Sequence, residues 1–314
     1  MDLIEVEFCD MQQTVQGQVI PSNLIGALIE TPASDPVAIR AALDNDGYVF
    51  LRNVLDVNDV LAARTEVFAE LESVDEIKSP AVDGIATGTS RRAELHRDLG
   101  AFWTNVSNGQ VLRHVTHGQP LNGILASIFE QPVRGHDLIY LRPTPPDRST
   151  RLHYDFPFFA GKATRIVTAW IPLGDIAADE GPLAIVENSS GFNDLLDPIR
   201  NIDYQSDHSN NTVQQAAYDK QNETDPVTML RDRGSRFLTS EYRVGDLLVF
   251  DGFTMHGSLD NQSKIGRVRL SVDVRYQAAA EPTTDERYFG ANPKGSKGQG
   301  YADMRGALPL DQPW

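Results

Sequence analysis

The stretch Arg267-Val-Arg-Leu-Ser-Val-Asp-Val-Arg-Tyr276 alternates polar and apolar side chains. Successive side chains of a β-strand point to opposite faces, so Arg267, Arg269, Ser271 and Asp273 are expected to share one face. The apolar residues between them share the other face, which we expect to pack against a layer of helices. The stretch therefore predicts a strand whose polar face looks into a cavity.

Four more β-rich runs lie ahead of this strand, at residues 137–142, 165–173, 181–186 and 246–250. Residues 34–130 carry helical signals instead, such as the apolar side chains that recur at steps of three and four between Val60 and Leu71. Short strands preceded by helices are typical of a β-sandwich or jelly roll that helices brace. The sequence thus predicts a mostly β fold with flanking helices.

We expect this fold to form a single catalytic domain over residues 1–314. Residues 34–130 would be helical support and residues 137–276 the jelly-roll core. Within the core, the long polar segment 191–240 is expected to be an insert or lid under which substrate enters. Residues 277–314 are rich in Gly and Pro and are expected to form a loose, irregular tail, because their glycine run does not match the P-loop pattern.

Charge and cysteine content restrict the partners. The 28 Lys and Arg residues against 44 Asp and Glu give a net charge of −16, which disfavours nucleic acid, anionic membranes and large polyanions unless a local basic pocket overrides the field. Cys9 is the one cysteine, so no internal disulfide is expected. The N-terminus has no signal-peptide pattern and no stretch has transmembrane length, so we expect a cytoplasmic protein, monomeric or homodimeric, with a small-molecule substrate.

A metal site is indicated by the stretch Arg151-Leu-His-Tyr-Asp-Phe-Pro-Phe158. On an extended strand, His153 and Asp155 would point to the same face. A third ligand, His256, follows directly after the apolar run 247–250. Two imidazoles and one carboxylate form the facial triad of non-haem Fe(II) oxygenases, whereas a structural zinc site is usually closed by four protein ligands. The spacing predicts that these three residues are the metal ligands and the catalytic centre.

Arg267 lies eleven residues after His256 on the expected polar strand face. An arginine there can pair bidentately with a carboxylate. A molecule of 2-oxoglutarate needs such a cation for its distal carboxylate while iron takes its 2-oxo-acid end. Arg269 shares the same face and competes for this role, and we favour Arg267.

At this point the chain resembles the phytanoyl-CoA dioxygenase-like family of Fe(II)/2-oxoglutarate oxygenases over roughly residues 45–276. The motifs that carry the resemblance are Gly47-Tyr-Val-Phe-Leu-Arg-Asn-Val-Leu55, His153-Tyr-Asp155, Thr168-Ala-Trp-Ile-Pro-Leu173, Glu180-Gly-Pro-Leu183, Gly245-Asp-Leu-Leu-Val-Phe250, His256-Gly-Ser258, Asn261 and Arg267. The resemblance implies a double-stranded β-helix, the cupin-like jelly roll. It also implies that iron, 2-oxoglutarate and O₂ are the cofactor and co-substrates.

Residue by residue, the resemblance implies that His153, Asp155 and His256 bind iron and that Arg267 holds the distal carboxylate. It implies supporting co-substrate contacts from Ser258, Thr168 and Tyr140. Candidates for substrate contacts are Arg142, Trp170 and Arg269. The family often has a Lys-Pro-Pro segment where this chain has Arg142-Pro-Thr144, which keeps the cation and changes its shape.

The expected reaction is hydroxylation of an unactivated C–H bond with release of succinate and CO₂. Related halogenases lack a carboxylate at the position of Asp155, so its presence favours hydroxylation over halogenation. Two alternatives stay open. One is a metal-dependent hydrolase or isomerase on the same fold, which needs no 2-oxoglutarate. The other is a metal-bearing binding protein without turnover.

Overall fold

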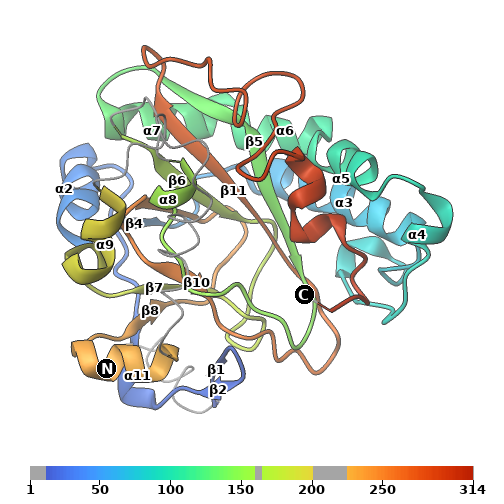
Figure 1. The fold of residues 1–314 in the computed structure, drawn as a ribbon, viewed down its shortest axis with the longest axis horizontal. Helices are drawn as coiled ribbons and strands as arrows, with labels where there is room; N and C mark the ends of the chain where they lie inside the picture. The colour runs from blue at the N-terminus through green and yellow to red at the C-terminus, as the bar shows by residue number, and fades with distance from the viewer. Residues whose placement is uncertain (1–11, 160–164, 201–224, 314) are drawn as a thin grey trace.

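The computed structural model describes residues 12–159, 165–200 and 225–313, and two facing sheets form its centre (Figure 1). The five-stranded sheet has the order β4 (Tyr48–Leu51), β9 (Leu247–Asp251), β6 (Val167–Pro172), β11 (Arg269–Ala278) and β5 (Val133–Thr144). The four-stranded sheet has the order β10 (His256–Ser258), β7 (Leu183–Val186), β8 (Phe237–Thr239) and β3 (Ile25–Ala27). Apart from the parallel pair β3 and β8, neighbouring strands run antiparallel, as in a jelly roll. The predicted fold class is confirmed.

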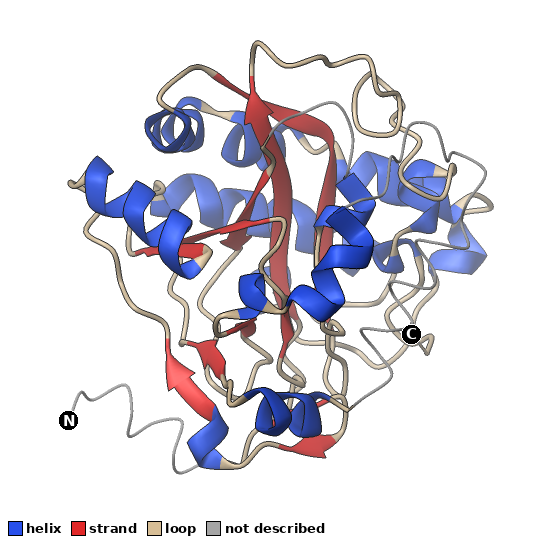
Figure 2. Cartoon of the chain, turned by 60° about the vertical axis from the view of Figure 1, so that its left-hand side comes forward, coloured by secondary structure: helices blue, strands red, loops and turns tan. Residues whose placement is uncertain are grey.

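Helices cover the outer face of the larger sheet (Figure 2). They are α2 (Pro36–Asp46), α3 (Val57–Ser73), α4 (Arg92–Leu95), α5 (Leu99–Ser107), α6 (Gln110–His117) and α7 (Gln119–Phe129). The first two begin where the side chains of Asp35 and Asp56 accept hydrogen bonds from backbone amides of the first turn. Helix α2 ends at Gly47, whose φ of 78° favours glycine. No described helix has both the length and the apolar composition needed to cross a membrane.

The two faces of β11 differ as its alternation predicts. Its apolar residues, including Leu270, Val272 and Val274, pack with buried residues of α3 in the main core. Its polar residues, from Arg269 to Arg275, are buried on the inner face, where Asp273 lies opposite Trp170 of β6. The strand therefore separates the helical layer from the interior between the sheets.

The structure corrects two local predictions. Strand β11 begins at Arg269 instead of Arg267. His153 makes only an isolated bridge with His256, and the short helix α8 (Phe156–Phe159) starts directly after Asp155, so no strand carries the His-x-Asp pair. This helical turn at residues 156–159 replaces the extended geometry that the spacing suggested.

The predicted insert 191–240 is only partly separate from the core. It contains α9 (Asn193–Arg200), α11 (Pro226–Arg233) and strand β8, which pairs with both β7 and β3. Residues 201–224 lie outside the described residues. The sequence also missed β3 and the hairpin of β1 (Thr14–Val15) and β2 (Gln18–Val19). Each of these strands is too short to show a period.

The C-terminal segment is not a loose tail. It contains two 3₁₀ turns, η4 (Gly300–Asp303) and η5 (Arg305–Ala307), which pack against α5 and β5 (Figure 1). Tyr301, Ala307 and Leu310 are buried in the main core. The segment therefore belongs to the folded domain.

Candidate functional site

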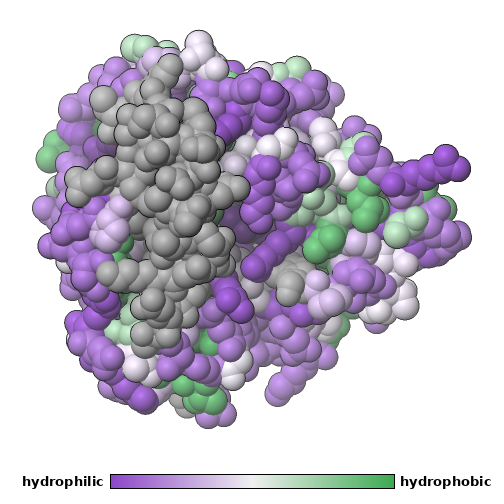
Figure 3. All heavy atoms as spheres, in the orientation of Figure 1, coloured by the Kyte–Doolittle hydropathy of each residue, from purple (hydrophilic) through white to green (hydrophobic). Residues whose placement is uncertain are grey.

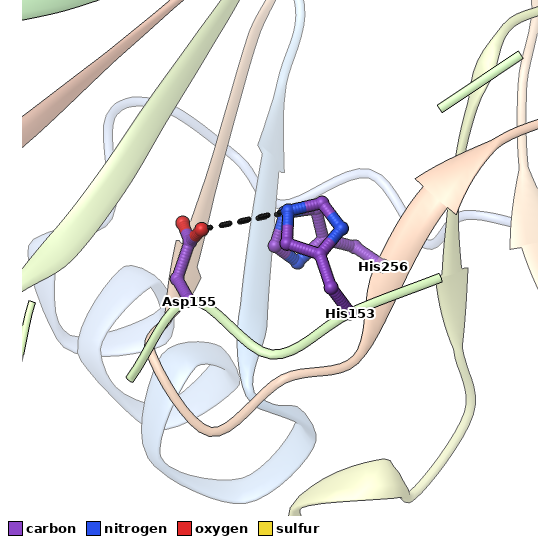
Figure 4. A group of neighbouring side chains, drawn as sticks. All are labelled: His153, Asp155 and His256. Carbon is purple, nitrogen blue, oxygen red and sulfur yellow. Dashed lines mark ion pairs between the residues drawn. The ribbon is translucent and has the colours of Figure 1, made fainter. Parts of the chain in front are cut away.

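His153, Asp155 and His256 meet at one end of the space between the sheets (Figure 4). One ligand atom from each lies within 4.8 Å of the others. Backbone hydrogen bonds hold the two histidine segments together, with His153 N 2.9 Å from His256 O and His256 N 3.0 Å from His153 O. The three residues predicted as metal ligands are thus brought together from two distant parts of the chain.

Hydrogen bonds fix which imidazole nitrogen faces the centre. Nδ1 of His153 lies 2.8 Å from the carbonyl oxygen of Arg151, and Nδ1 of His256 lies 3.0 Å from that of Thr254. A carbonyl only accepts, so Nδ1 carries the hydrogen and leaves the Nε2 lone pair available. These Nε2 atoms lie 3.6 and 3.9 Å from Oδ1 of Asp155. Such outer hydrogen bonds are typical of histidines that bind metals.

Burial keeps both imidazoles neutral. It lowers the pKa of His153 to about 3, helped by the neighbouring His256, and it also lowers the pKa of His256. Neutral imidazole is the form that binds a metal. The centre therefore offers two neutral nitrogens and one carboxylate oxygen.

Asp155 is held by two further side chains. Nη2 of Arg275 lies 2.7 Å from Oδ1 and 2.8 Å from Oδ2, while the Thr168 hydroxyl donates to Oδ2 at 2.5 Å. Burial is the largest single influence and alone would raise the pKa of Asp155, but Arg275 together with His256, His153 and the Thr168 hydroxyl outweighs it and holds that pKa well below its usual range. Asp155 is therefore an oriented, ionised carboxylate. Arg275 was missed at the sequence level, although it continues the alternation of the polar face of β11.

The residues predicted to bind 2-oxoglutarate occupy different environments. Tyr140 lines the cavity beside the metal ligands, and Thr168 is bound to Asp155. Ser258 is buried next to Leu259 and its hydroxyl accepts a hydrogen bond from Thr150 N at 2.8 Å. Arg267 precedes β11, does not line the cavity, and has Nε 3.2 Å from Oε1 of Glu180.

Arg269 does not line the cavity either, but it is buried on the inner face of β11, whereas the Arg267 side chain is 36% exposed. Nη1 of Arg269 donates to Ser271 Oγ at 2.9 Å and its Nη2 to Thr144 Oγ1 at 2.7 Å. Burial lowers its pKa to about 10, which leaves it charged at neutral pH. The inner face also carries buried polar atoms without a hydrogen-bond partner among the described residues, namely Arg269 Nε, Arg275 Nη1, Asp273 Oδ1 and Trp170 Nε1. A polar ligand inside the barrel would satisfy such atoms.

The two other predicted substrate residues differ from each other. Arg142 lines the cavity and pairs with Asp273, with Nε 2.6 Å from Oδ2. Trp170 is fully buried in the barrel core against Tyr242, with ring centroids 4.6 Å apart, and does not line the cavity.

A cavity of about 230 Å³ opens above the metal ligands. Leu138, Phe158 and Phe159 form an apolar part of its lining, and residues of the C-terminal segment 295–306 form another part. Ligand cavities typically combine apolar walls with a few polar groups in this way. No sequence pattern predicted that the C-terminal segment lines this cavity, because that segment has no regular period.

Comparison with known proteins supports this description. The family model described as phytanoyl-CoA dioxygenase (PhyH) matches residues 43–268. The solved epimerase SnoN, in complex with Fe³⁺, alpha ketoglutarate and nogalamycin RO, is 19% identical, with a TM-score of 0.50 over 88% of this chain and 94% of that chain. EctD from S. alaskensis in its apoform is 16% identical, with a TM-score of 0.50 over 85% of each chain.

A third similar structure is the carbocyclase SnoK from nogalamycin biosynthesis, which is 19% identical with a TM-score of 0.50 over 81% of this chain and 88% of that chain. At these identities the structures show a shared fold. The family model shows more, because it spans well over half of the chain and includes all three metal-ligand candidates. The chain therefore belongs to the phytanoyl-CoA dioxygenase (PhyH) family.

Proposed function

We propose that this protein is an Fe(II)- and 2-oxoglutarate-dependent oxygenase that hydroxylates an unactivated C–H bond of a small organic substrate and releases succinate and CO₂. The observation that carries the proposal is the open triad of His153, Asp155 and His256 beneath a cavity. Across the described parts of the chain, no fourth His, Cys, Asp or Glu joins this group. Three protein ligands on one side leave room for a chelating co-substrate and O₂.

The donor set fits the predicted metal. Two neutral imidazoles and a carboxylate suit Fe(II), and membership of the PhyH family agrees with Fe(II) and 2-oxoglutarate as the cofactors predicted from the sequence. When bound, iron with 2-oxoglutarate and O₂ supplies the oxidising power for C–H chemistry. The protein supplies orientation, with Arg275 and Thr168 fixing Asp155, and a cavity wall of Phe158 and Phe159 that excludes water.

We further propose that Arg269 anchors the distal carboxylate of 2-oxoglutarate. It is charged and buried on the inner face of β11, whereas Arg267 precedes that strand and its side chain is 36% exposed. The sequence favours Arg267 for this role, but its pairing with Glu180 supports a structural role for it instead. Ser258, Thr168 and Tyr140 stay proposed supporting residues, and Arg142 a proposed substrate contact.

The outcome of the reaction is part of the proposal. The carboxylate of Asp155 would occupy the metal position that a halide needs in a halogenase. Its presence therefore favours hydroxylation over halogenation. The fold is shared with an epimerase and a carbocyclase, so product analysis must distinguish the gain of an oxygen atom from a rearrangement or ring closure. A cytoplasmic location and the absence of nucleic-acid and membrane partners stay predictions from composition.

The test is anaerobic addition of Fe(II) and 2-oxoglutarate to the folded protein. The expected result is the weak visible charge-transfer band of the iron chelate, and its loss in His256→Ala. The exposed His114, in contact with Asp59, provides the matched control, because His114→Ala should keep the band. Folded protein that gives no band would contradict the proposal. Turnover without 2-oxoglutarate would favour the hydrolase or isomerase, and a band without succinate on exposure to air would favour the binding protein.

A further inference from the structure

The C-terminal segment 295–306 forms a wall of the metal cavity and brings charged side chains to it. Lys297, Asp303 and Arg305 of this segment line the same cavity as His153 and Asp155. In Figure 1 the segment lies beside β5, far in sequence from the metal ligands. The identity of its side chains therefore bears on what the cavity binds.

The wall is held in a defined position. Arg92 is fully buried, and its Nη1 donates to the carbonyl oxygens of Gly306 at 2.6 Å and Leu308 at 3.1 Å. The hydroxyl of Tyr301 accepts hydrogen bonds from Arg113 Nη2 at 2.7 Å and from Ile139 N at 3.2 Å. A segment fixed in this way presents its charges without a large ordering cost when a ligand binds.

The charge of the cavity is opposite to that of the whole chain. Five cationic side chains and two carboxylates line it, in a protein whose net charge is −16. The cations are Arg142, Arg151, Arg275, Lys297 and Arg305, and the carboxylates are Asp155 and Asp303. The local field therefore attracts anions even though the overall field repels them.

Two of these cations are already neutralised by buried acids. Arg142 pairs with Asp273, and Arg275 pairs with Asp155. The positive charge that these pairs leave over is carried by Arg151 and Lys297, two exposed side chains that line the cavity.

Arg151 and Lys297 have no side-chain hydrogen bond or ion pair with any residue that the structure describes. Arg151 is also tied to the metal centre, because its carbonyl oxygen accepts the hydrogen bond from Nδ1 of His153. Its guanidinium and the ammonium of Lys297 are thus available for a ligand held over the metal. The described part of the face in Figure 3 is mostly hydrophilic, with small hydrophobic patches.

We propose that the substrate carries an anionic oxygen group, a carboxylate or a phosphate, which Arg151 and Lys297 bind at the cavity mouth. Its apolar part would lie against Phe158 and Phe159, with a C–H bond toward the metal. The volume of about 230 Å³ is small for a ligand site, so the enclosed part of the substrate is small. This inference deepens the proposed function and rests on it for the reaction, whereas anion binding depends only on Arg151 and Lys297.

The experiment compares probes that differ mainly in charge. Phenyl phosphate is compared with phenol, and phenylacetate with phenylacetamide, by calorimetry at millimolar concentration. Binding is measured on the protein loaded anaerobically with Fe(II) and 2-oxoglutarate, and again on the metal-free protein. The anions should bind at least about tenfold more tightly than their neutral counterparts. The neutral probes cannot form charge-assisted hydrogen bonds with Arg151 and Lys297. The tighter anion identifies carboxylate or phosphate as the preferred group.

Variants assign the effect to the cavity mouth. Lys297→Gln and Arg151→Gln should each weaken anion binding by about tenfold to a hundredfold, while leaving the affinity for 2-oxoglutarate unchanged. Lys294→Gln is the matched control, because Lys294 pairs with Glu286 at 2.7 Å outside the cavity lining. It should leave anion binding unchanged.

Three outcomes would overturn the inference. They are equal binding of charged and neutral probes, no binding of either anion, and an equal loss in Lys294→Gln and Lys297→Gln. Failure of the proposed function has a different signature, because the charge-transfer band would be absent while the metal-free protein still bound the anions.

Discussion

Arg275 and Asp155 form a fully buried ion pair, with Nη2 2.7 Å from Oδ1 and Nε 3.2 Å from Oδ2. Arg275 also lies over the rings of Tyr140 and Phe159, 4.4 and 4.5 Å from their centroids. The metal-ligand carboxylate thus has a cationic partner of its own. In the metal-free protein that partner compensates a charge that burial would otherwise penalise.

The first prediction concerns Arg275→Met. Loss of one partner of a buried pair costs about 3–5 kcal/mol, so the metal-free variant should be strongly destabilised. A divalent metal supplies the missing positive charge, so Ni²⁺ should raise the melting temperature of the variant by more than it raises that of the parent protein. Arg52→Met serves as control, because Arg52 pairs with the buried Asp246 at 2.6 Å outside the cavity lining. Equal metal-induced shifts in all three proteins would contradict a link between Arg275 and Asp155.

The second prediction separates Arg269 from Arg267. Arg269→Met removes an inner-face cation, so the KM for 2-oxoglutarate should rise by about tenfold or more, as expected for a lost charge-assisted hydrogen bond. Arg267→Met removes a partner of Glu180 and should change that KM by less than about twofold. Metal binding, followed by calorimetry with Ni²⁺, should persist in both. A rise confined to Arg267→Met would restore the assignment made from the sequence.

The metal ligands could be predicted from the sequence because chemistry restricts them strongly. Few residue types bind iron, and a His-x-Asp pair with His256 after an apolar strand leaves few other combinations. Alternation likewise predicted both faces of β11, and the core contacts of Leu270 and Val272 confirm the outer one. The start of that strand could not be predicted, because Arg267 and Arg269 both fit the polar positions of the alternating pattern. The pattern alone does not show that the chain is still in a turn at Arg267 and enters the strand only at Arg269.

The walls of the cavity depend on contacts that no local pattern encodes. The C-terminal segment has no helical or strand period, and its position depends on Arg92 and on buried residues such as Tyr301. Arg275 followed the predicted alternation, but its role depends on meeting Asp155, which is 120 residues away in sequence. Such pairings become visible only when distant segments are folded together.

The third prediction concerns the ion pair that holds the C-terminal segment. Arg92 and Glu76 are both buried; Glu76 Oε1 also accepts a hydrogen bond from Leu310 N at 3.3 Å. Arg92→Met leaves Glu76 unpaired, so the free energy of unfolding measured in urea should fall by about 3–5 kcal/mol. The C-terminal segment 295–306 should also become more susceptible to limited proteolysis.

A double variant tests whether the pair itself is responsible. Arg92→Met with Glu76→Met removes both charges, so it should be more stable than Arg92→Met alone. If the stability loss of the double variant equals the summed losses of the two single variants, each side chain acts through separate contacts. Proteolysis that stays as slow as in the parent protein would mean that Arg92 does not hold the segment.

The fourth prediction concerns the acid side of the stability profile. His136 of β5 is buried and stacks on Tyr288, with ring centroids 5.0 Å apart. Burial lowers its pKa from 6.5 to about 3, the charge of Arg275 acts in the same direction, and Asp285 opposes it. Because the folded pKa lies below the unfolded value, the unfolded chain binds the extra proton between these two pH values.

The free energy of unfolding should therefore be highest above pH 6.5 and should fall as the pH decreases toward 3. One such histidine contributes a loss of about 2 kcal/mol between about pH 7 and about pH 5. His136→Gln removes the titrating group, so urea unfolding of this variant should show a loss smaller by about that amount, whatever its stability at neutral pH. If parent and variant lose the same stability over this range, His136 is protonated at an ordinary pKa and does not contribute to acid unfolding.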